Sequence, residues 1–402
     1  MLINKTYFID SCDDVELNIK RESKLEYRIT YDDEKEMKAV VFVIGGFGVN
    51  SNISFLDFDR KFLCKKFDVI VVNVFYHCFC ARESINEKYN PSMIPNQEDL
   101  SNIQRILNAL SINIKANENN FLDLISYINE NVKVLKDKGL IDIDQKAILS
   151  CGIIPPNNEY QNYGIMAAID HINALKDILN KYPQFKTLPK IYGGGSYGGY
   201  LSFMCAKIAP WYVDGVIDNS CVVLPYLPHI IGRDMNTGEF VFKNVNYELI
   251  CYVKRYWTSN ENSLYFFGKE NYLIRAILNS KHLYEQSKMN NKTIIVSYHS
   301  CEDQGAPVQN KIDLIDTYKH LGFNTTLHLI KDEKDIDGRF IKSLEHGLRM
   351  SDKALFNKEL PNMLEKLKGK EFSIREDSIS YPCKDKVFTF KDKDDKFVLE
   401  LN

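Results

Sequence analysis

The chain has 402 residues, of which 51 are Lys or Arg and 54 are Asp or Glu, giving a formal net charge of −3 at pH 7. This balance gives no reason to expect nucleic acid as a partner, and a hydrophobic content of 45% indicates a folded globular protein. No signal peptide is visible, and the longest apolar run, residues 39–49, is too short and too glycine-rich to span a bilayer. The ten cysteines are scattered, so we expect a cytoplasmic protein with reduced thiols.

The order of apolar patterns along the chain predicts alternating strands and helices. Short alternating segments at 6–9 and 25–30 are typical of antiparallel edge strands, and the continuous β-branched run at 39–44 is typical of a strand buried on both faces. Further buried strands are expected at 67–75, 189–192, 213–223, 293–298 and 325–330. Helices are expected at 163–179, 200–208, 308–321 and 351–367, the first from its apolar residues at helical spacing.

This alternation predicts an α/β fold with a doubly wound, mostly parallel sheet, whose reactive groups gather at the carboxyl ends of the strands. Two largely helical insertions, 77–160 and 224–290, are expected to cap the active face within one domain, 1–369. Residues 370–402 alternate and are heavily charged, so we expect a small terminal hairpin there.

The most informative stretch is the glycine-rich run 193–199, which contains Gly194-x-Ser196-x-Gly198. In this pattern a tight turn from a strand into a helix exposes the serine hydroxyl above the end of a sheet. The turn leaves little room for side chains beside the serine, which favours residues without a Cβ atom. The run lacks the Lys-Ser/Thr ending of a phosphate-binding loop, and we expect no cofactor.

A serine nucleophile needs a base within hydrogen-bond reach and an acid that orients the base. The acid is expected in the loop after the strand 293–298, where Asp303 is our choice and Glu302 its nearest rival. His346 lies after the last strand and before the last helix, where the base is required. Other histidines fit this position less well; they are His299 on the acid loop, His320 on a helix and His328 within a strand.

An oxyanion hole would use two backbone N–H groups. One belongs to the residue after the nucleophile, Tyr197, and the other to the glycine-rich loop 45–48, where Phe47 is the first choice and Gly46 the second. We expect no metal, because the run 77–80 (His-Cys-Phe-Cys) has no second half of a metal site. Arg82 and Arg233 flank the insertions, where an arginine could pair with an anionic substrate, although surface positions are expected for both.

The segment 194–200, Gly-Gly-Ser-Tyr-Gly-Gly-Tyr, resembles the nucleophile segment of the prolyl oligopeptidase branch of the α/β-hydrolases. The loop 45–48 is similar to that branch's oxyanion loop, and the resemblance implies Ser196 as nucleophile, Asp303 as acid and His346 as base. The chain departs from the branch in having 38 residues before the first buried strand, where the oligopeptidases carry a propeller. Ile44 replaces an oxyanion-binding tyrosine, and no acidic pair for a peptide amino terminus is recognisable. The full-length layout also resembles a family of Campylobacter-type proteins encoded near flagellin-glycosylation genes, which implies acyl groups on sugars.

We therefore expect a serine hydrolase that forms an acyl-enzyme on Ser196 and acts on a carboxylic ester, such as an O-acyl group on a sugar or another small polar metabolite. An acyltransferase with the same triad, a peptidase of short peptides and a non-catalytic binding protein are the alternatives. The sequence leaves the acyl chain length, the substrate-binding residues, the oligomeric state and any movement of the insertions open.

Overall fold

The computed structural model of the chain describes residues 1–47, 53–80 and 84–402. An eight-stranded sheet forms the centre of the body, and in it only the second strand runs antiparallel to the others. In sheet order the strands are β1 (Leu2–Asp10), β2 (Lys24–Asp32), β4 (Ile70–Phe75), β3 (Val40–Val43), β7 (Lys190–Gly195), β8 (Gly215–Asn219), β11 (Ile294–Ser300) and β12 (Asn324–Ile330).

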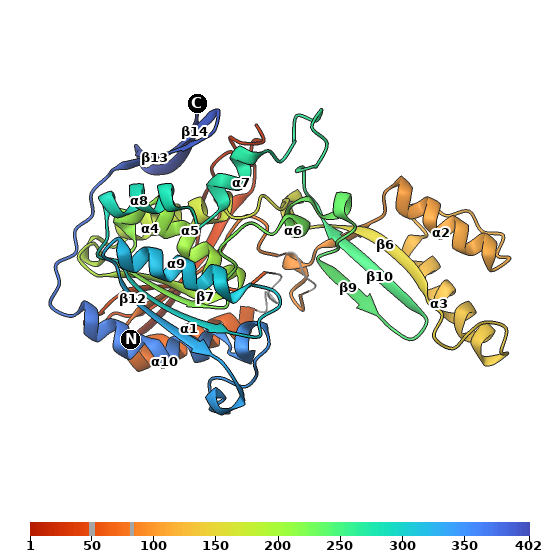
Figure 1. The fold of residues 1–402 in the computed structure, drawn as a ribbon, viewed down its shortest axis with the longest axis horizontal. Coiled ribbons are helices and arrows are strands. Elements are labelled where there is room, and N and C mark those ends of the chain that lie inside the picture. The colour runs from red at the N-terminus through yellow and green to blue at the C-terminus, as the bar shows by residue number, and fades with distance from the viewer. Residues whose placement is uncertain (48–52, 81–83) are drawn as a thin grey trace.

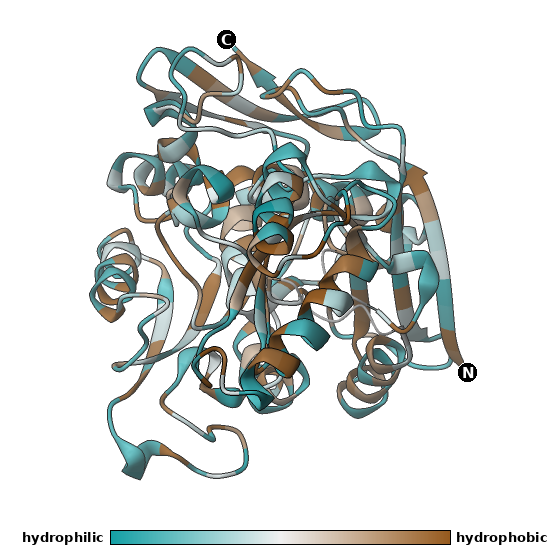
Figure 2. Ribbon diagram, turned by 90° about the vertical axis from the view of Figure 1, so that its right-hand side faces the viewer, coloured by the Kyte–Doolittle hydropathy of each residue, from teal (hydrophilic) through white to brown (hydrophobic). Residues whose placement is uncertain are grey.

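Helices cover both faces of this sheet (Figure 1). One face carries α1 (Ile53–Phe67) and α10 (Asp352–Leu367). The other carries α4 (Ile165–Lys181), α5 (Tyr197–Ile208), α8 (Ser280–Met289) and α9 (Val308–His320). In β3, Val40 and Phe42 enter one core and Val41 and Val43 the other, which explains the unbroken apolar run. Figure 2 shows hydrophobic residues concentrated in the central strands and hydrophilic ones in the outer loops.

The two insertions meet in a second sheet with the order β5 (Ser92–Ile94), β6 (Ala147–Ile154), β10 (Tyr247–Val253) and β9 (Phe240–Lys243). β6 from the first insertion pairs in parallel with β10 from the second, so the insertions form one unit that extends from the body in Figure 1. Helices α2 (Gln97–Ala109) and α3 (Phe121–Asp137) pack against this sheet, and the short helices α6 (Leu227–Ile231) and α7 (Lys269–Arg275) belong to the second insertion. The sequence predicted the helices of this unit but not its strands.

The tail forms a three-stranded antiparallel sheet of β13 (Ser378–Cys383), β14 (Lys386–Lys393) and β15 (Lys396–Leu401). This is one strand more than the expected hairpin. The sheet packs on α4 and α8 of the body, and Phe388, Phe390 and Phe397 enter the main core. The alternation of these aromatic residues with charged ones therefore reflects one buried and one solvated face.

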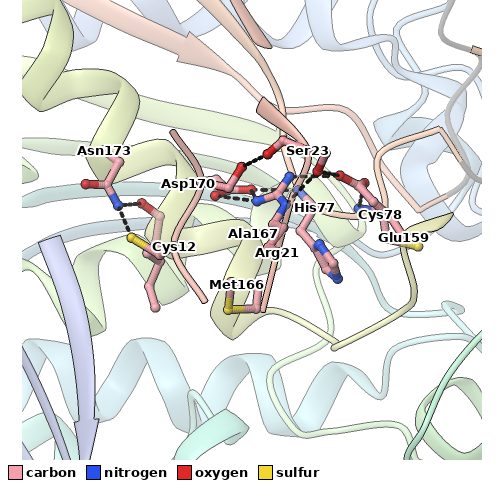
Figure 3. A network of polar contacts seen from close by, with 12 residues as sticks. Cys12, Arg21, Ser23, His77, Cys78, Glu159, Met166, Ala167, Asp170 and Asn173 are labelled. Atoms are coloured by element: carbon pink, nitrogen blue, oxygen red, sulfur yellow. Dashed lines mark hydrogen bonds and ion pairs between the residues drawn. The ribbon is translucent and has the colours of Figure 1, made fainter. Parts of the chain in front are cut away.

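A buried ion network joins the two ends of the first insertion to the body (Figure 3). Arg21 donates to both oxygens of Asp170 on α4, at 2.8 and 2.6 Å, and to Glu159 at 2.9 Å. The two carboxylates accept the backbone N–H groups of the turn after β4, His77 at 2.7 Å and Cys78 at 2.6 Å. Because the insertion starts at residue 77 and ends near 159, both of its ends are joined to the two carboxylates that pair with Arg21.

Candidate active site

Ser196 occupies the turn between β7 and α5 with φ 54° and ψ −117°. A residue other than glycine at positive φ is strained, typically by 1–3 kcal/mol, and persists only where its surroundings determine the backbone. Here the N–H of Ser196 donates to the carbonyl of Asn219 at 2.7 Å, and its carbonyl accepts from Tyr200 at 3.1 Å. The turn therefore holds the serine in the orientation that the Gly-x-Ser-x-Gly pattern predicts.

The glycines around this serine are required by close contacts of the backbone. A Cβ atom on Gly194 or on Gly198 would lie 1.9 Å from the carbonyl oxygen of Ile44, the residue that leads into the loop 45–48. A Cβ atom on Gly199 would lie 2.1 Å from Oδ1 of Asp218. These contacts allow the turn to approach the end of β3 more closely than side chains would permit.

The structure brings Ser196, His346 and Asp303 together in one chain of hydrogen bonds. Nε2 of His346 lies 2.8 Å from Oγ of Ser196, and its Nδ1 lies 3.0 and 2.9 Å from the two oxygens of Asp303. A carboxylate only accepts hydrogen bonds, so Nδ1 of His346 carries a proton, and an unprotonated Nε2 can accept one from the serine. The side chain of His346 is 36% exposed and that of Asp303 is fully buried.

Asp303 is held in its charged form. Burial acts to raise the pKa of this carboxyl, but the hydrogen bond and charge of His346, the backbone N–H of Ala306 and the charge of His299 outweigh it, so the pKa lies below its usual value. Oδ1 also accepts from the N–H of Gly305 at 2.8 Å and of Ala306 at 2.9 Å. Glu302, the rival acid, is exposed.

His346 begins a short irregular segment in which Gly347, Leu348 and Arg349 all have positive φ, at 77°, 55° and 46°. Leu348 is fully buried. Such a run of left-handed residues is stable only when neighbouring groups fix it. The segment lies between the end of β12 and the start of α10, as the chain order of the triad requires.

Residues 45–47 of the loop 45–48 lie against the serine turn. A Cβ atom on Gly46 would be 3.3 Å from the carbonyl oxygen of Gly195 and 3.7 Å from Cβ of Ser196, and the ring of Phe47 packs edge-on against that of Tyr197 at 5.6 Å. The three residues expected to form the oxyanion hole, Gly46, Phe47 and Tyr197, are thus neighbours of the serine. Gly48, the last residue of this loop, lies outside the described residues.

The remaining candidates have other partners. Arg233 makes a bidentate ion pair with the buried Asp99, at 2.8 and 3.1 Å, and Arg82 lies outside the described residues.

The other histidines considered for the base have partners of their own. His299 is buried and donates to the carbonyl of Ala306 at 2.8 Å, which supports the acid loop. His320 bonds the carbonyl of Asp316 on its own helix, and His328 stacks on Tyr298. Across 1–47, 53–80 and 84–402, no group of three or more metal-ligating side chains is assembled.

Three residues near the site were not singled out from the sequence. His229 on α6 stacks on Phe47 with a centroid distance of 5.4 Å, Asn219 ends β8, and Asp352 begins α10. The positions of the last two, at a strand's carboxyl end and just after the segment of His346, were readable from the sequence. The contact of His229 depends on how the second insertion folds back, which has no local signature in the sequence.

The strand order, the single antiparallel strand and the serine turn at the end of β7 define an α/β-hydrolase fold. Residues 5–401 match the family described as Protein of unknown function (DUF2920), and the chain belongs to this family. A comparison with curated proteins gives no match. In the described part of the chain, no helix has the length and apolar character needed to cross a membrane.

Several solved structures are similar to this chain at low sequence identity. They include the Pyrococcus horikoshii acylaminoacyl peptidase (13% identity, 94% of this chain and 43% of that chain, TM-score 0.46). An esterase of Pyrobaculum calidifontis (10% identity, 91% and 85%, TM-score 0.44) and a puromycin hydrolase (11% identity, 92% and 40%, TM-score 0.47) are further examples. The chain thus spans less than half of the length of the acylaminoacyl peptidase.

Proposed function

We propose that the protein is a serine hydrolase that cleaves carboxylic esters through an acyl-enzyme on Ser196. The observation that carries this proposal is the continuous set of hydrogen bonds from Oγ of Ser196 through His346 to Asp303. A serine held on strained backbone, a buried carboxylate held in its charged form and an imidazole between them are the parts that nucleophilic catalysis requires.

In the proposed reaction, Oγ of Ser196 attacks the ester carbonyl carbon while its proton passes to Nε2 of His346. The negative charge that develops on the carbonyl oxygen is stabilised by hydrogen bonds that the N–H of Tyr197 and that of Phe47 or Gly46 donate to it. When the intermediate collapses, the C–O bond to the leaving alcohol breaks and His346 returns the proton to this alcohol. Water then attacks the acyl-enzyme by the same steps and releases the acid, while Asp303 holds the Nδ1 proton throughout.

A small polar metabolite carrying an O-acyl group, such as an acylated sugar, is the proposed substrate. Phe47 stacks on His229, and Tyr226, which is 46% exposed, packs edge-on against His229 at 4.8 Å. This aromatic row leads from the exposed Tyr226 to Phe47, one of the proposed oxyanion donors. It supports a binding site in which a ring face packs on aromatic side chains, two of which, Tyr226 and His229, belong to the second insertion.

Labelling by a fluorophosphonate probe and hydrolysis of p-nitrophenyl acetate, each beside Ser196→Ala, test the proposal. We expect both in the native protein and neither in the variant. Absence of labelling in the native protein would contradict catalysis and favour a binding protein. A panel of acetylated sugars, p-nitrophenyl esters and short peptide amides, assayed with and without an added alcohol acceptor, then separates esterase, peptidase and acyltransferase activity.

A further inference from the structure

Ser196 and His346 are held by elements that are not adjacent in the chain, so their distance depends on contacts between two segments. Ser196 follows β7, whereas His346 starts the irregular segment before α10. The three positive φ values after His346 show that regular backbone hydrogen bonds do not fix this segment by themselves. Other groups must hold it in register with the serine turn.

Asn219, at the carboxyl end of β8, contacts both segments. Its carbonyl accepts the N–H of Ser196 at 2.7 Å, and its Nδ2 donates to the carbonyl of Gly347 at 2.8 Å. The hydroxyl of Ser220 donates to Oδ1 at 3.0 Å, which fixes the orientation of the amide. Asn219 is fully buried. One residue thus bonds the backbone of the serine on one side and of the residue after the histidine on the other.

Asp352 makes the reciprocal contact from the histidine side. It is the first residue of α10, and its Oδ1 accepts the N–H of Gly195 at 2.8 Å. The ladder between β3 and β7 ends at the pair Val43–Gly193, so the N–H of Gly195 lies beyond it. The carboxyl of Asp352 therefore supplies the acceptor that the neighbouring strand no longer offers, immediately before the nucleophile.

We propose that Asn219 and Asp352 are positioning residues that set the distance between Ser196 and His346. Together their bonds close a ring that runs from Ser196 to Asn219, to Gly347, along the chain to Asp352 and back through Gly195. The inference rests on the proposed function, because it concerns the geometry of the same triad. Neither side chain takes part in the reaction itself.

Loss of either bond is expected to let the imidazole shift relative to the serine hydroxyl, and a displacement of about 1 Å in an active site can cost 10²-fold in rate. Substrate binding does not involve either bond. We therefore expect Asn219→Ala and Asp352→Ala each to lower kcat by roughly 10- to 100-fold with KM little changed. Asp352→Asn keeps an oxygen acceptor for Gly195, so its kcat should stay within about threefold of native.

Ser351→Ala is the matched control for the start of α10. The Ser351 hydroxyl accepts the N–H of Ala354 at 3.3 Å as the cap of this helix, so the variant weakens the same helix start without affecting the bond to Gly195. Steady-state kinetics with p-nitrophenyl acetate and the rate of fluorophosphonate labelling are measured on all four variants. A native kcat in both Asn219→Ala and Asp352→Ala would overturn the proposal. An equal fall of kcat in Asp352→Asn, Asp352→Ala and Ser351→Ala would also overturn it.

A readout that needs no substrate separates this proposal from the proposed function. The low-field proton NMR signal of the His346 Nδ1–H, assigned by its loss in His346→Ala, reports the geometry of the imidazole against Asp303. We expect the signal to shift in Asn219→Ala and Asp352→Ala and to stay in place in Asp352→Asn and Ser351→Ala. If the fluorophosphonate probe does not label the native protein but the signal shows this pattern, catalysis is refuted and positioning is not. An unchanged signal in Asn219→Ala and in Asp352→Ala would refute positioning.

Discussion

Nε2 of His346 lies 2.8 Å from Oγ of Ser196, although 150 residues separate them in the sequence. Adjacent strands explain this proximity, because β7, β8, β11 and β12 are consecutive neighbours in the sheet. Serine, acid and histidine each follow the carboxyl end of one of these parallel strands, at the same edge of the sheet. The topology alone brings the three segments together, and local contacts then determine which side chains meet.

Substitutions at two neighbouring carboxylates test which of them orients His346. Asp303 bonds His346 through both oxygens, whereas Glu302 is exposed. Asp303→Asn should lower kcat by about 10³- to 10⁴-fold, because the amide no longer selects the reactive tautomer of the imidazole. Glu302→Gln should leave kcat within about twofold, as surface substitutions do. Steady-state ester hydrolysis measures both, and a larger effect of Glu302→Gln would transfer the acid's role to that residue.

Backbone strain at Ser196, the proposed nucleophile, predicts that a substitution can raise the stability of the protein while it abolishes activity. Ser196 has φ 54°, which glycine adopts at little cost. Ser196→Ala and Ser196→Gly remove the same hydroxyl, and only the glycine also relieves the backbone. We expect both variants to be inactive and Ser196→Gly to be more stable than Ser196→Ala by about 1 kcal/mol. Urea unfolding at pH 7 measures this difference, and equal midpoints would show that the turn stores no strain.

Two consecutive glycines are expected to respond differently to alanine. A Cβ atom on Gly194 would overlap the Ile44 carbonyl oxygen at 1.9 Å, whereas on Gly195 it would make an ordinary contact of 3.5 Å with Oδ1 of Asp352. Gly194→Ala should destabilise the protein by at least about 3 kcal/mol or prevent folding, because backbone cannot move aside easily. Gly195→Ala should cost less than about 1 kcal/mol. Thermal unfolding followed by circular dichroism compares the two.

The sequence predicted most of the sheet because its strands carry a local signal. The run 39–44 and the strand expected at 293–298 correspond to β3 and β11, and the helix expected at 351–367 to α10. Residues buried on both faces of a parallel strand are continuously apolar, so they are visible without knowledge of the partners. The three residues of the proposed triad were chosen from chain order and loop position, and the structure places them within hydrogen-bond distance.

The second sheet, formed by β5, β6, β10 and β9 of the two insertions, was not predicted, for a physical reason. β6 alternates Leu149, Cys151 and Ile153 with partly exposed residues, but its partner β10 lies about a hundred residues further on and a single short strand is ambiguous. The buried network around Arg21 was missed for the same reason, because its members are spread between residues 21 and 170. Pairings of high sequence separation have no local signature, and they determine both features.

Removing one member of the Arg21 network is expected to destabilise the protein strongly, because its partners stay buried with unpaired charges. Arg21→Met leaves Asp170 and Glu159 buried without their cation, which is expected to cost about 3–5 kcal/mol. The control is Lys24→Met, which removes an exposed pair with Asp10 and should change stability by less than about 1 kcal/mol. Guanidinium unfolding at pH 7 measures both. A cost for Arg21→Met as small as that of the control would contradict a structural role for the network.

Asp352 should make the stability of the protein depend on pH. Burial raises the pKa of this carboxyl to about 7, opposed by the hydrogen bond from Gly195 and aided by the charge of Asp59. Between about pH 4 and 7 the folded protein holds a proton that the unfolded chain has released, so this group's contribution to stability is present at low pH and is lost as pH rises through 7.

Asp352→Asn removes this dependence while keeping the acceptor for Gly195. At pH 4, where Asp352 is protonated in the folded state and the unfolded chain has only begun to release its proton, variant and native protein should be similarly stable. At pH 8 the native protein carries a partly buried charge that the variant lacks, so the variant should be more stable by roughly 2 kcal/mol. A shift of one pKa unit corresponds to about 1.4 kcal/mol, and solvent that reaches part of the side chain reduces the total. Urea unfolding at the two pH values tests the sign directly. A variant less stable than the native protein at pH 8 would show that the ionised carboxylate, rather than the neutral acid, is the form that the serine turn requires.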